Sequence, residues 1–167
     1  MSQTTSDQHT LWELIKDIKF GMMTHSHANG MLHSHPLTTQ NKTHDEGAHL
    51  YFFISSNSEL AQRIALDGNV NVSYADPSAD SYVSLSGQAA VLQDQARKES
   101  LWSPSDKAWF PGGVSDPDLA LLEVTISHAE YWDVKESKMV QLFKIARAAL
   151  IGQAPASLGE HKELHVS

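Results

Sequence analysis

The stretch 69-NVNVSYADPSADSYVSLSGQAAVLQ-93 decides the fold. Apolar and polar residues alternate along Val70–Ala75 and again from Tyr82 to Gln93, with the period of two that is typical of β-strands. Asp76-Pro77-Ser78 separates the two runs and has the composition of a tight turn. Two strands joined by so short a turn pair antiparallel. The stretch therefore predicts a β-hairpin and, with it, an antiparallel sheet.

The rest of the chain adds strands on both sides of this hairpin. Strand character is found at residues 18–26, 31–40, 49–55 and 119–127, with a short extended piece at 131–134. Helical patterns cover residues 10–19, the segment from Ser56 to Gly68, and residues 95–102 and 139–151. A sheet of six strands on a chain of this length avoids open edges by curling. We expect a mainly β protein with flanking helices, built on a six-stranded antiparallel barrel.

Composition limits the classes of protein to which the chain belongs. With 167 residues, 41% of them apolar, it fits one globular domain, expected at 11–152 between a disordered lead-in (1–10) and a flexible tail (153–167). A net charge of −8 disfavours nucleic acid and anionic membranes as partners. The absence of cysteine excludes disulfides, thiolate catalysis and cysteine-ligated zinc. Since no signal peptide or membrane-spanning stretch is evident, we expect a cytoplasmic location.

Histidines are concentrated in the segment 24-THSHANGMLHSHP-36. Each His-x-His pair shares one face of a strand, so His25 with His27, or His33 with His35, could bind a metal. A hairpin loop of two or four residues around Asn29-Gly30 places the two pairs on opposite faces, and only an odd-length loop or a bulge brings them together. The alternative, favoured for His25 and His27, is that these are exposed or half-exposed histidines at a hairpin tip.

Two further features admit two interpretations each. Ser55, Ser56 and Ser58 surround a helix start, where free N–H groups attract anions, so they form either a phosphate site or an ordinary N-cap. Trp109 and Phe110 stand in the polar loop 103-SPSDKAWFPGG-113. They either fold back on the core or contact a partner chain or a flat ligand.

Several stretches together resemble one family. They are "LWELIKDIKFGMMT", "NVNVSYADP", "SYVSLSGQA", "KAWFPGG", "DPDLALLEVT", "AEYWDV" and "QLFKIARAAL". In order and spacing they are similar to the bacterial general stress proteins related to pyridoxamine 5′-phosphate oxidase. The resemblance covers Leu11 to Gly152. It implies a split β-barrel that forms a homodimer and binds FMN or FAD between subunits.

The resemblance also implies site residues. The family's Arg-Ser-Arg-Pro corresponds to His33, Ser34, His35 and Pro36, and the segment through Gln40 would run beside the isoalloxazine. Phe53, Ile54 and Ser55 would continue towards the phosphate, which would lie near Ser55 and Ser58. Trp109 and Phe110 of the partner subunit would close over the flavin.

The chain departs from the family where positive charge is expected. Histidines replace both strand arginines, and Asn57 and Leu60 stand where the family often has an arginine and a lysine. The sequence favours a flavin-dependent oxidoreductase of unknown small-molecule substrate that binds flavin more tightly at pH 6 than at pH 8, because protonated histidine partly replaces arginine. The alternatives are a dimeric stress-related binding protein that has lost its cofactor and a histidine-rich metal-binding protein.

Overall fold

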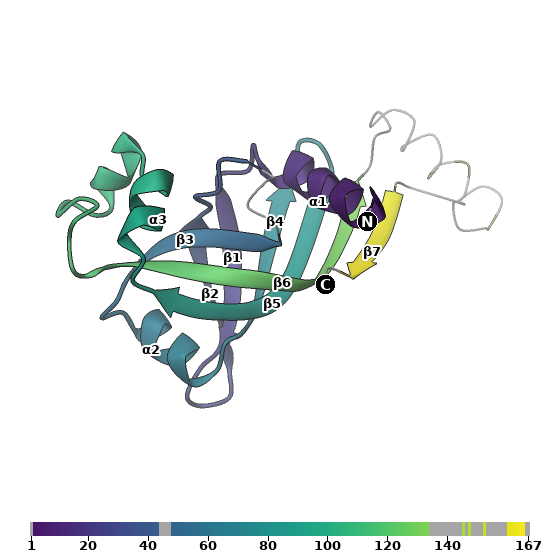
Figure 1. Cartoon of the computed structure of the whole chain (residues 1–167). Coiled ribbons are helices and arrows are strands. Elements are labelled where there is room, and N and C mark those ends of the chain that lie inside the picture. The colour runs from purple at the N-terminus through teal and green to yellow at the C-terminus, as the bar shows by residue number, and fades with distance from the viewer. Residues whose placement is uncertain are drawn as a thin grey trace.

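Seven antiparallel strands form one sheet in the computed structural model, which describes residues 2–43, 48–133, 145, 147, 152 and 160–165 (Figure 1). Their bounds are β1 (Phe20–Ser26), β2 (Leu32–Thr38), β3 (His49–Ser55), β4 (Asn69–Asp76), β5 (Ser81–Leu92), β6 (Leu119–Asp133) and β7 (Glu160–His165). The strand order is β2-β1-β4-β5-β6-β3, and β7 pairs with β6. The predicted β4–β5 hairpin is therefore confirmed and forms the middle of the sheet.

The two end strands of the sheet meet just beyond β2. Thr39 forms an isolated antiparallel bridge with Phe52 of β3, and the Gln40 N–H donates to the Tyr51 carbonyl at 2.8 Å. The Asn41 side chain continues this contact, since its Oδ1 accepts from the Tyr51 N–H at 2.8 Å. The sheet thus curls into a barrel whose closing seam is short. This confirms the mainly β, split-barrel fold.

The long strands β5 and β6 bend because of an irregularity in their pairing. The register shifts between Ser86 and Gly87, which is the mark of a β-bulge. A Cβ atom on Gly87 would lie 2.0 Å from the Thr125 carbonyl oxygen, so only glycine fits there. The bend lets β5 pair with both β4 and β6 around the barrel.

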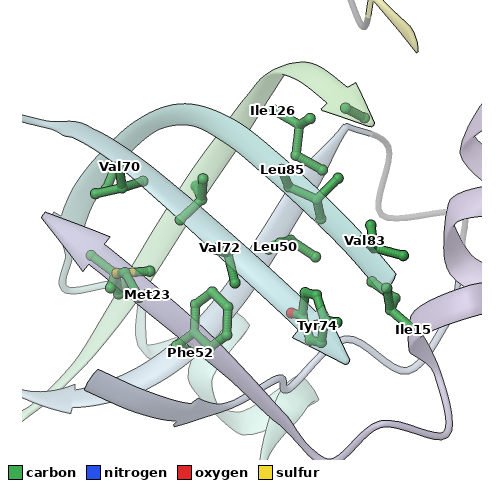
Figure 2. Close-up of a cluster of buried hydrophobic side chains, with 14 of the residues drawn as sticks. Ile15, Met23, Leu50, Phe52, Val70, Val72, Tyr74, Val83, Leu85 and Ile126 are labelled. Carbon is green, nitrogen blue, oxygen red and sulfur yellow. The ribbon is translucent and has the colours of Figure 1, made fainter. Parts of the chain in front are cut away.

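The main core fills the inside of the barrel (Figure 2). Alternate residues of each strand point inward, which is why the period of two in the sequence located the strands. Met23, Phe52, Val72, Leu85 and Val124 have no exposed surface. Leu11 and Ile15 of helix α1 (Ser2–Ile15) cover one side of this core.

A smaller core lies on the outer face of β3 and β6. It consists of Tyr51, Phe53, Leu101, Leu119 and Leu121, with Leu92, Trp102 and Phe110 packed against it. Helix α3 (Gln95–Leu101) and the 3-10 helix η2 (Pro104–Ala108) lie at this end of the molecule (Figure 1). Because both faces of β3 are covered, its residues Leu50 to Ile54 are buried without alternation, as the apolar run had indicated.

The helices agree with the sequence pattern in the middle of the chain and differ at its start. Helix α2 (Glu59–Leu66) begins after Ser58, whose Oγ accepts from the Ala61 N–H at 3.1 Å, so the predicted N-cap is confirmed. Helix α1 instead begins at Ser2 and ends at Ile15, although residues 1–10 were predicted to be disordered and the helix to cover 10–19. Apolar residues begin only at Leu11, so periodicity could not detect the polar first turns.

The C-terminal part also differs from the prediction. Residues 160–165, expected in a flexible tail, form β7 along the end of β6, where Leu164 enters the main core. The described strands therefore number seven rather than six, and the piece 119–127 joins residues 131–133 of the second predicted piece in the single strand β6, while Val134 lies outside the described residues. The predicted helix 139–151 lies outside the described residues apart from two positions. No helix in the described part of the chain is long and apolar enough to span a membrane.

Candidate functional site

A pocket of about 350 Å³ opens between the β1–β2 pair and the end of the molecule that carries η2. We call it the aromatic pocket. Its lining residues are Phe20, Pro36, Leu37, Thr38, Gln40, Phe53, Asp106, Trp109 and Phe110. Four of the predicted site residues, Pro36, Gln40, Phe53 and Trp109, are among them. Segments that are far apart in the sequence are brought together here by the seam between β2 and β3.

The two loop aromatics have different roles in this pocket. Phe110 folds back onto the smaller core, where its ring meets Phe53 edge-on at a centroid distance of 6.3 Å. Trp109 stays at the rim with 67% of its surface exposed. The first alternative, folding back on the core, is therefore confirmed for Phe110, whereas contact of Trp109 with a partner chain or a flat ligand stays a prediction. Trp109 also lines the pocket of its own chain, whereas the family resemblance had implied that it closes over the flavin of the partner subunit.

One end of the pocket is polar and rigid. The Gln40 amide donates to Asp106 Oδ1 at 3.1 Å, and both side chains are buried. The second oxygen of Asp106 accepts from the backbone N–H and the hydroxyl of Ser103 at 2.7 and 2.9 Å. These bonds hold the Gln40 amide in one place beside the aromatic rings.

The α2 entrance, which we define as Ser55–Ser58, binds an anion of the chain itself. The Asp118 carboxylate accepts from Ser55 Oγ at 2.6 Å, Ser56 Oγ at 3.0 Å and the Asn57 side chain at 2.7 Å. It also accepts from the Asn57 backbone N–H at 3.2 Å. These hydrogen bonds, led by the one from Ser55, lower the pKa of Asp118. The donors predicted to hold a phosphate are therefore already used, and Ser58 is occupied as the N-cap.

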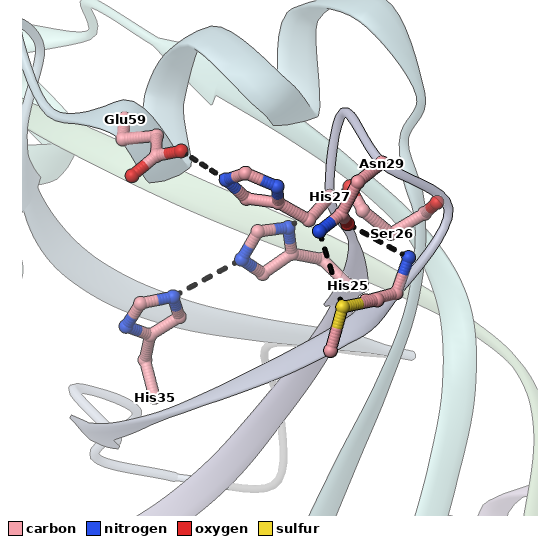
Figure 3. Close-up of polar contacts among 7 residues, drawn as sticks. His25, Ser26, His27, Asn29, His35 and Glu59 are labelled. Carbon is pink, nitrogen blue, oxygen red and sulfur yellow. Dashed lines mark hydrogen bonds and ion pairs between the residues drawn. The ribbon is translucent and has the colours of Figure 1, made fainter.

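Three hairpin histidines, His25, His27 and His35, lie between β1–β2 and the start of α2 (Figure 3), and the ring of the fourth, His33, stacks on that of His27. The loop His27–Met31 has five residues, so His25 lies directly opposite His33 and Met23 opposite His35. An odd loop was the one arrangement expected to unite the two pairs. The prediction that the two His-x-His pairs lie on opposite faces, which assumed a loop of two or four residues, is thus wrong. Gly30, with φ of +79°, provides the left-handed residue that this longer loop uses.

Contacts among these imidazoles are close. His25 and His35 approach through their Nε2 atoms at 3.1 Å, and the rings of His27 and His33 stack at 4.1 Å between centroids. Only 2% of His25 is exposed, so the interpretation as an exposed or half-exposed histidine of the hairpin tip is wrong for His25, whereas the His27 side chain is half-exposed at 22%. We call His25, His27, His33 and His35 the histidine cluster.

A carboxylate completes this region. His27 donates its Nε2 hydrogen to Glu59 in the first turn of α2 (Figure 3), and this bond lowers the pKa of Glu59. Burial, together with the neighbouring His25 and His33, lowers the pKa of His35, so its ring is held neutral more readily than free histidine. Within the described residues, no three histidine, aspartate or glutamate side chains stand ready around one metal position.

The remaining predicted residues are dispersed. His33 and His35 belong to the histidine cluster and not to the lining of the aromatic pocket. Ser34 lies on the opposite face of β2, where its hydroxyl bonds Thr24 at 2.6 Å. Ile54 points into the main core, away from its neighbour Phe53.

Sequence reasoning missed several residues of these sites. Asp106 belongs to a capping box with Ser103, and the pattern Ser-Pro-Ser-Asp was a detectable signal for it. Phe20 was read only as part of a strand. No signal in the sequence indicated Asp118 and Glu59, because their hydrogen-bond partners are set by tertiary contacts and not by a regular spacing along the chain.

Comparisons with known proteins agree with this architecture. The sequence model of the family described as "Pyridoxamine 5′-phosphate oxidase like" matches residues 6–156. The chain is 24% identical over 155 residues to protein bli-3 of Neurospora crassa, covering 87% of this chain and 73% of that protein.

Two solved structures illustrate the likeness in three dimensions. A protein assigned as general stress protein 26 from Jannaschia sp. CCS1 superposes with a TM-score of 0.73 at 23% identity, covering 99% of each chain. The general stress FMN/FAD binding protein of Xanthomonas citri superposes with a TM-score of 0.67 at 30% identity, covering 78% of this chain and 90% of that one.

Proposed function

Because the chain belongs to the pyridoxamine 5′-phosphate oxidase-like family, we propose that it binds a flavin, FMN or FAD, in the aromatic pocket. The flavin would make it an oxidoreductase acting on a small molecule. One observation carries the proposal: a preformed pocket lined by four aromatic rings and a fixed amide at the seam of the barrel. A relative that is 30% identical is an FMN/FAD binding protein, which supports the same ligand class.

The pocket fits the ring half of a flavin. An isoalloxazine is flat and largely apolar, and it carries hydrogen-bonding groups along one edge. Phe20, Phe53 and Trp109 offer apolar surface for stacking, and the Gln40 amide offers polar contact for the edge. The flavin would supply the redox chemistry when bound, while these residues would bind it, orient it and exclude water.

The region predicted to hold the phosphate fits poorly. Asp118 occupies the α2 entrance, and Glu59 adds a second carboxylate at the same helix end. His33 and His35 face the histidine cluster, and the lowered pKa of His35 makes it a weak substitute for arginine. Each charge-assisted hydrogen bond lost costs about 1.5–3 kcal/mol, so two losses weaken binding roughly a hundredfold or more. We therefore expect the affinity for flavin to come from contacts with the ring and to change little between pH 6 and pH 8. This expectation replaces the tighter binding at pH 6 that was inferred from the sequence.

A homodimer is part of the proposal. Apolar side chains on the outer face of β1 and at the pocket rim are exposed in the single chain, with Phe20 at 43%, Met22 at 40% and Trp109 at 67%. Neighbouring large apolar groups of this kind mark a contact surface. A second copy of the chain would cover them and would narrow the mouth of the aromatic pocket.

The proposal is tested by titrating flavin fluorescence with protein prepared without a histidine tag. We expect saturable quenching by the wild-type chain and about tenfold weaker binding by Trp109→Ala, since an aromatic contact of this kind contributes about 1.4 kcal/mol. Trp132→Ala is the matched control, because Trp132 is also partly exposed but stacks on His161 at the β6–β7 edge. No saturable quenching by the wild type, or equal loss in both variants, would refute flavin binding in this pocket.

The Asp118 contacts favour a second candidate function, a dimeric binding protein that has lost its cofactor. In that case, the purified chain would be colourless, and added flavin would leave its melting temperature unchanged. The same titration therefore decides between the two functions.

A further inference from the structure

We propose that the histidine cluster binds one divalent first-row transition-metal ion through the Nε2 atoms of His25 and His35. This inference is independent of flavin binding, because neither residue lines the aromatic pocket. Neutral imidazole is a preferred ligand of Zn²⁺, Ni²⁺ and Cu²⁺, and the general order of affinities makes Cu²⁺ the tightest of these.

The spacing of the two nitrogens suits a shared ion. His25 Nε2 and His35 Nε2 are 3.1 Å apart. Two nitrogens bound at about 2.05 Å with that separation subtend an angle of roughly 100° at the metal, between the square-planar and the tetrahedral values. The two ring planes are inclined by only 14°, and their centroids lie 5.1 Å apart. Small movements of the half-exposed His35 are enough to admit the ion.

The backbone fixes this arrangement. The five-residue loop puts His25 opposite His33, and His35 follows two residues later on the same face of β2. His25 is buried, and its Nδ1 lies 3.3 Å from the Ser26 carbonyl oxygen (Figure 3). Since a carbonyl only accepts, Nδ1 carries the hydrogen and Nε2 keeps its lone pair. In proteins, a metal-binding histidine is usually oriented by such a hydrogen bond from the ring nitrogen that does not bind the metal.

His35 needs one rearrangement to become the second ligand. Its Nε2 donates to His25 in the metal-free chain, because His25 Nε2 is the acceptor. On metal binding, the Nε2 proton of His35 leaves to solvent and a proton returns at Nδ1, so the ring stays neutral and no electron is transferred. The half-buried position of His35 leaves it open to the exchange.

Further ligands and charge balance are close at hand. The His33 ring centroid lies 6.3 Å from that of His25, so a change of side-chain rotamer can bring a third imidazole to the ion. The Nδ1 atom of His27 is buried and has no hydrogen-bond partner among the described residues. Glu59, bonded to His27, supplies negative charge next to the site. Water fills the remaining positions, which explains how a site can form although no three ligands are preassembled.

The test uses isothermal titration of untagged, chelator-treated protein, free of added flavin, with ZnCl₂, NiCl₂ and CuCl₂ in separate runs. We expect one ion per chain and the tightest binding for Cu²⁺. His35→Gln, at a half-exposed position, is expected to weaken binding at least tenfold, and His25→Gln similarly. His128→Gln, which changes a partly exposed histidine on β6, is the control and should bind like the wild type.

Circular dichroism of each variant shows whether it is folded, and His35→Gln keeps the test decisive if His25→Gln fails to fold. Electron paramagnetic resonance of the Cu²⁺-loaded chain should show nitrogen hyperfine splitting that His35→Gln changes. Several weak sites that His35→Gln and His128→Gln affect equally would overturn the proposal. Unchanged metal binding by Trp109→Ala would separate this result from any failure of flavin binding.

Discussion

Phe53 and Ser55 lie two residues apart on the same face of β3, yet they belong to regions with opposite properties. Phe53 lines the aromatic pocket, where apolar surface lies beside the Gln40 amide and the Asp106 carboxylate that holds it. Ser55 belongs to the α2 entrance, where donors are saturated by Asp118. A pocket for a flat ring depends on shape, which the barrel seam supplies. An anion site depends on free donors and positive charge. The Asp118 carboxylate, in the loop before β6, occupies the donors and adds negative charge. In the proposed flavin site, the ring half would therefore be kept while the phosphate half is weakened.

The largest expected effect comes from removing the shared wall of the aromatic pocket and the smaller core. Phe53 is buried and packs against Trp102 and Phe110. Phe53→Ala should lower the free energy of unfolding by about 3–5 kcal/mol and abolish flavin quenching, because a cavity replaces the ring. Urea denaturation measures the first effect. Ser55→Ala, two residues away, should be milder, and a loss as large as that of Phe53→Ala would break the comparison.

A smaller loss is expected at the polar end of the pocket. Asp106→Ala leaves the Gln40 amide and the Ser103 N–H without their acceptor, which costs about 1–3 kcal/mol in unfolding free energy. Flavin affinity should fall as well, because Gln40 is no longer held in place. Lys107→Ala, on the same 3-10 turn but exposed, is the control for urea denaturation. Equal stability of the two variants would mean that the polar end is not organised by Asp106.

The α2 entrance offers a gain of binding. Asp118→Asn removes the negative charge but keeps the size of the side chain, so we expect FMN to bind a few-fold more tightly than to the wild type. Riboflavin, which has no phosphate, should not respond. Fluorescence titration with both ligands measures the difference. An equal change for both would show that Asp118 acts on the ring and not on the phosphate.

The smallest effect is a dependence of stability on pH. Hydrogen bonds from Ser55, Ser56 and Asn57 lower the pKa of Asp118 below its ordinary value of 3.8, so around that pH the folded chain binds fewer protons than the unfolded chain. The contribution of Asp118 is therefore present above pH 3.8 and is lost as the pH falls through the folded-state value. Urea denaturation between pH 5 and pH 2.5 should show the stability gap between wild type and Asp118→Asn closing on acidification. A gap that stays constant would contradict this role.

Local patterns in the sequence predicted the sheet well. The apolar run at 49–55 and the alternation in β4 and β5 reflect burial that each segment experiences over its whole length. Closure into a barrel was expected because six strands on a chain of this length avoid open edges by curling, and the family resemblance implied the same fold. Helix α1 was predicted only in its last turns, from residue 10, and β7 was not predicted, because the polar residues that begin and end the chain take their structure from packing against β5 and β6.

The candidate site was only partly predictable. The resemblance placed Pro36, Gln40 and Phe53 along the flavin together with Trp109 of the partner subunit, whereas the aromatic pocket brings all four residues together within one chain. The parity of the hairpin loop could not be read from Asn29-Gly30, since that dipeptide fits loops of several lengths. One extra loop residue turned His33 and His35 towards His25. Asp118 lies 63 residues from Ser55, and no spacing rule connects them.

In the proposed function, the aromatic pocket binds the flavin ring, and no site in the described part of the chain holds the phosphate. The most direct test of this proposal is the ratio of the dissociation constants of riboflavin and FMN for the wild-type chain. Fluorescence titration at pH 7 in one buffer provides both values. If uncharged surface alone holds the ligand, the two constants agree within about threefold, well under the tenfold that 1.4 kcal/mol would give. Binding of FMN that is a hundredfold tighter would reveal a working phosphate site and contradict the account.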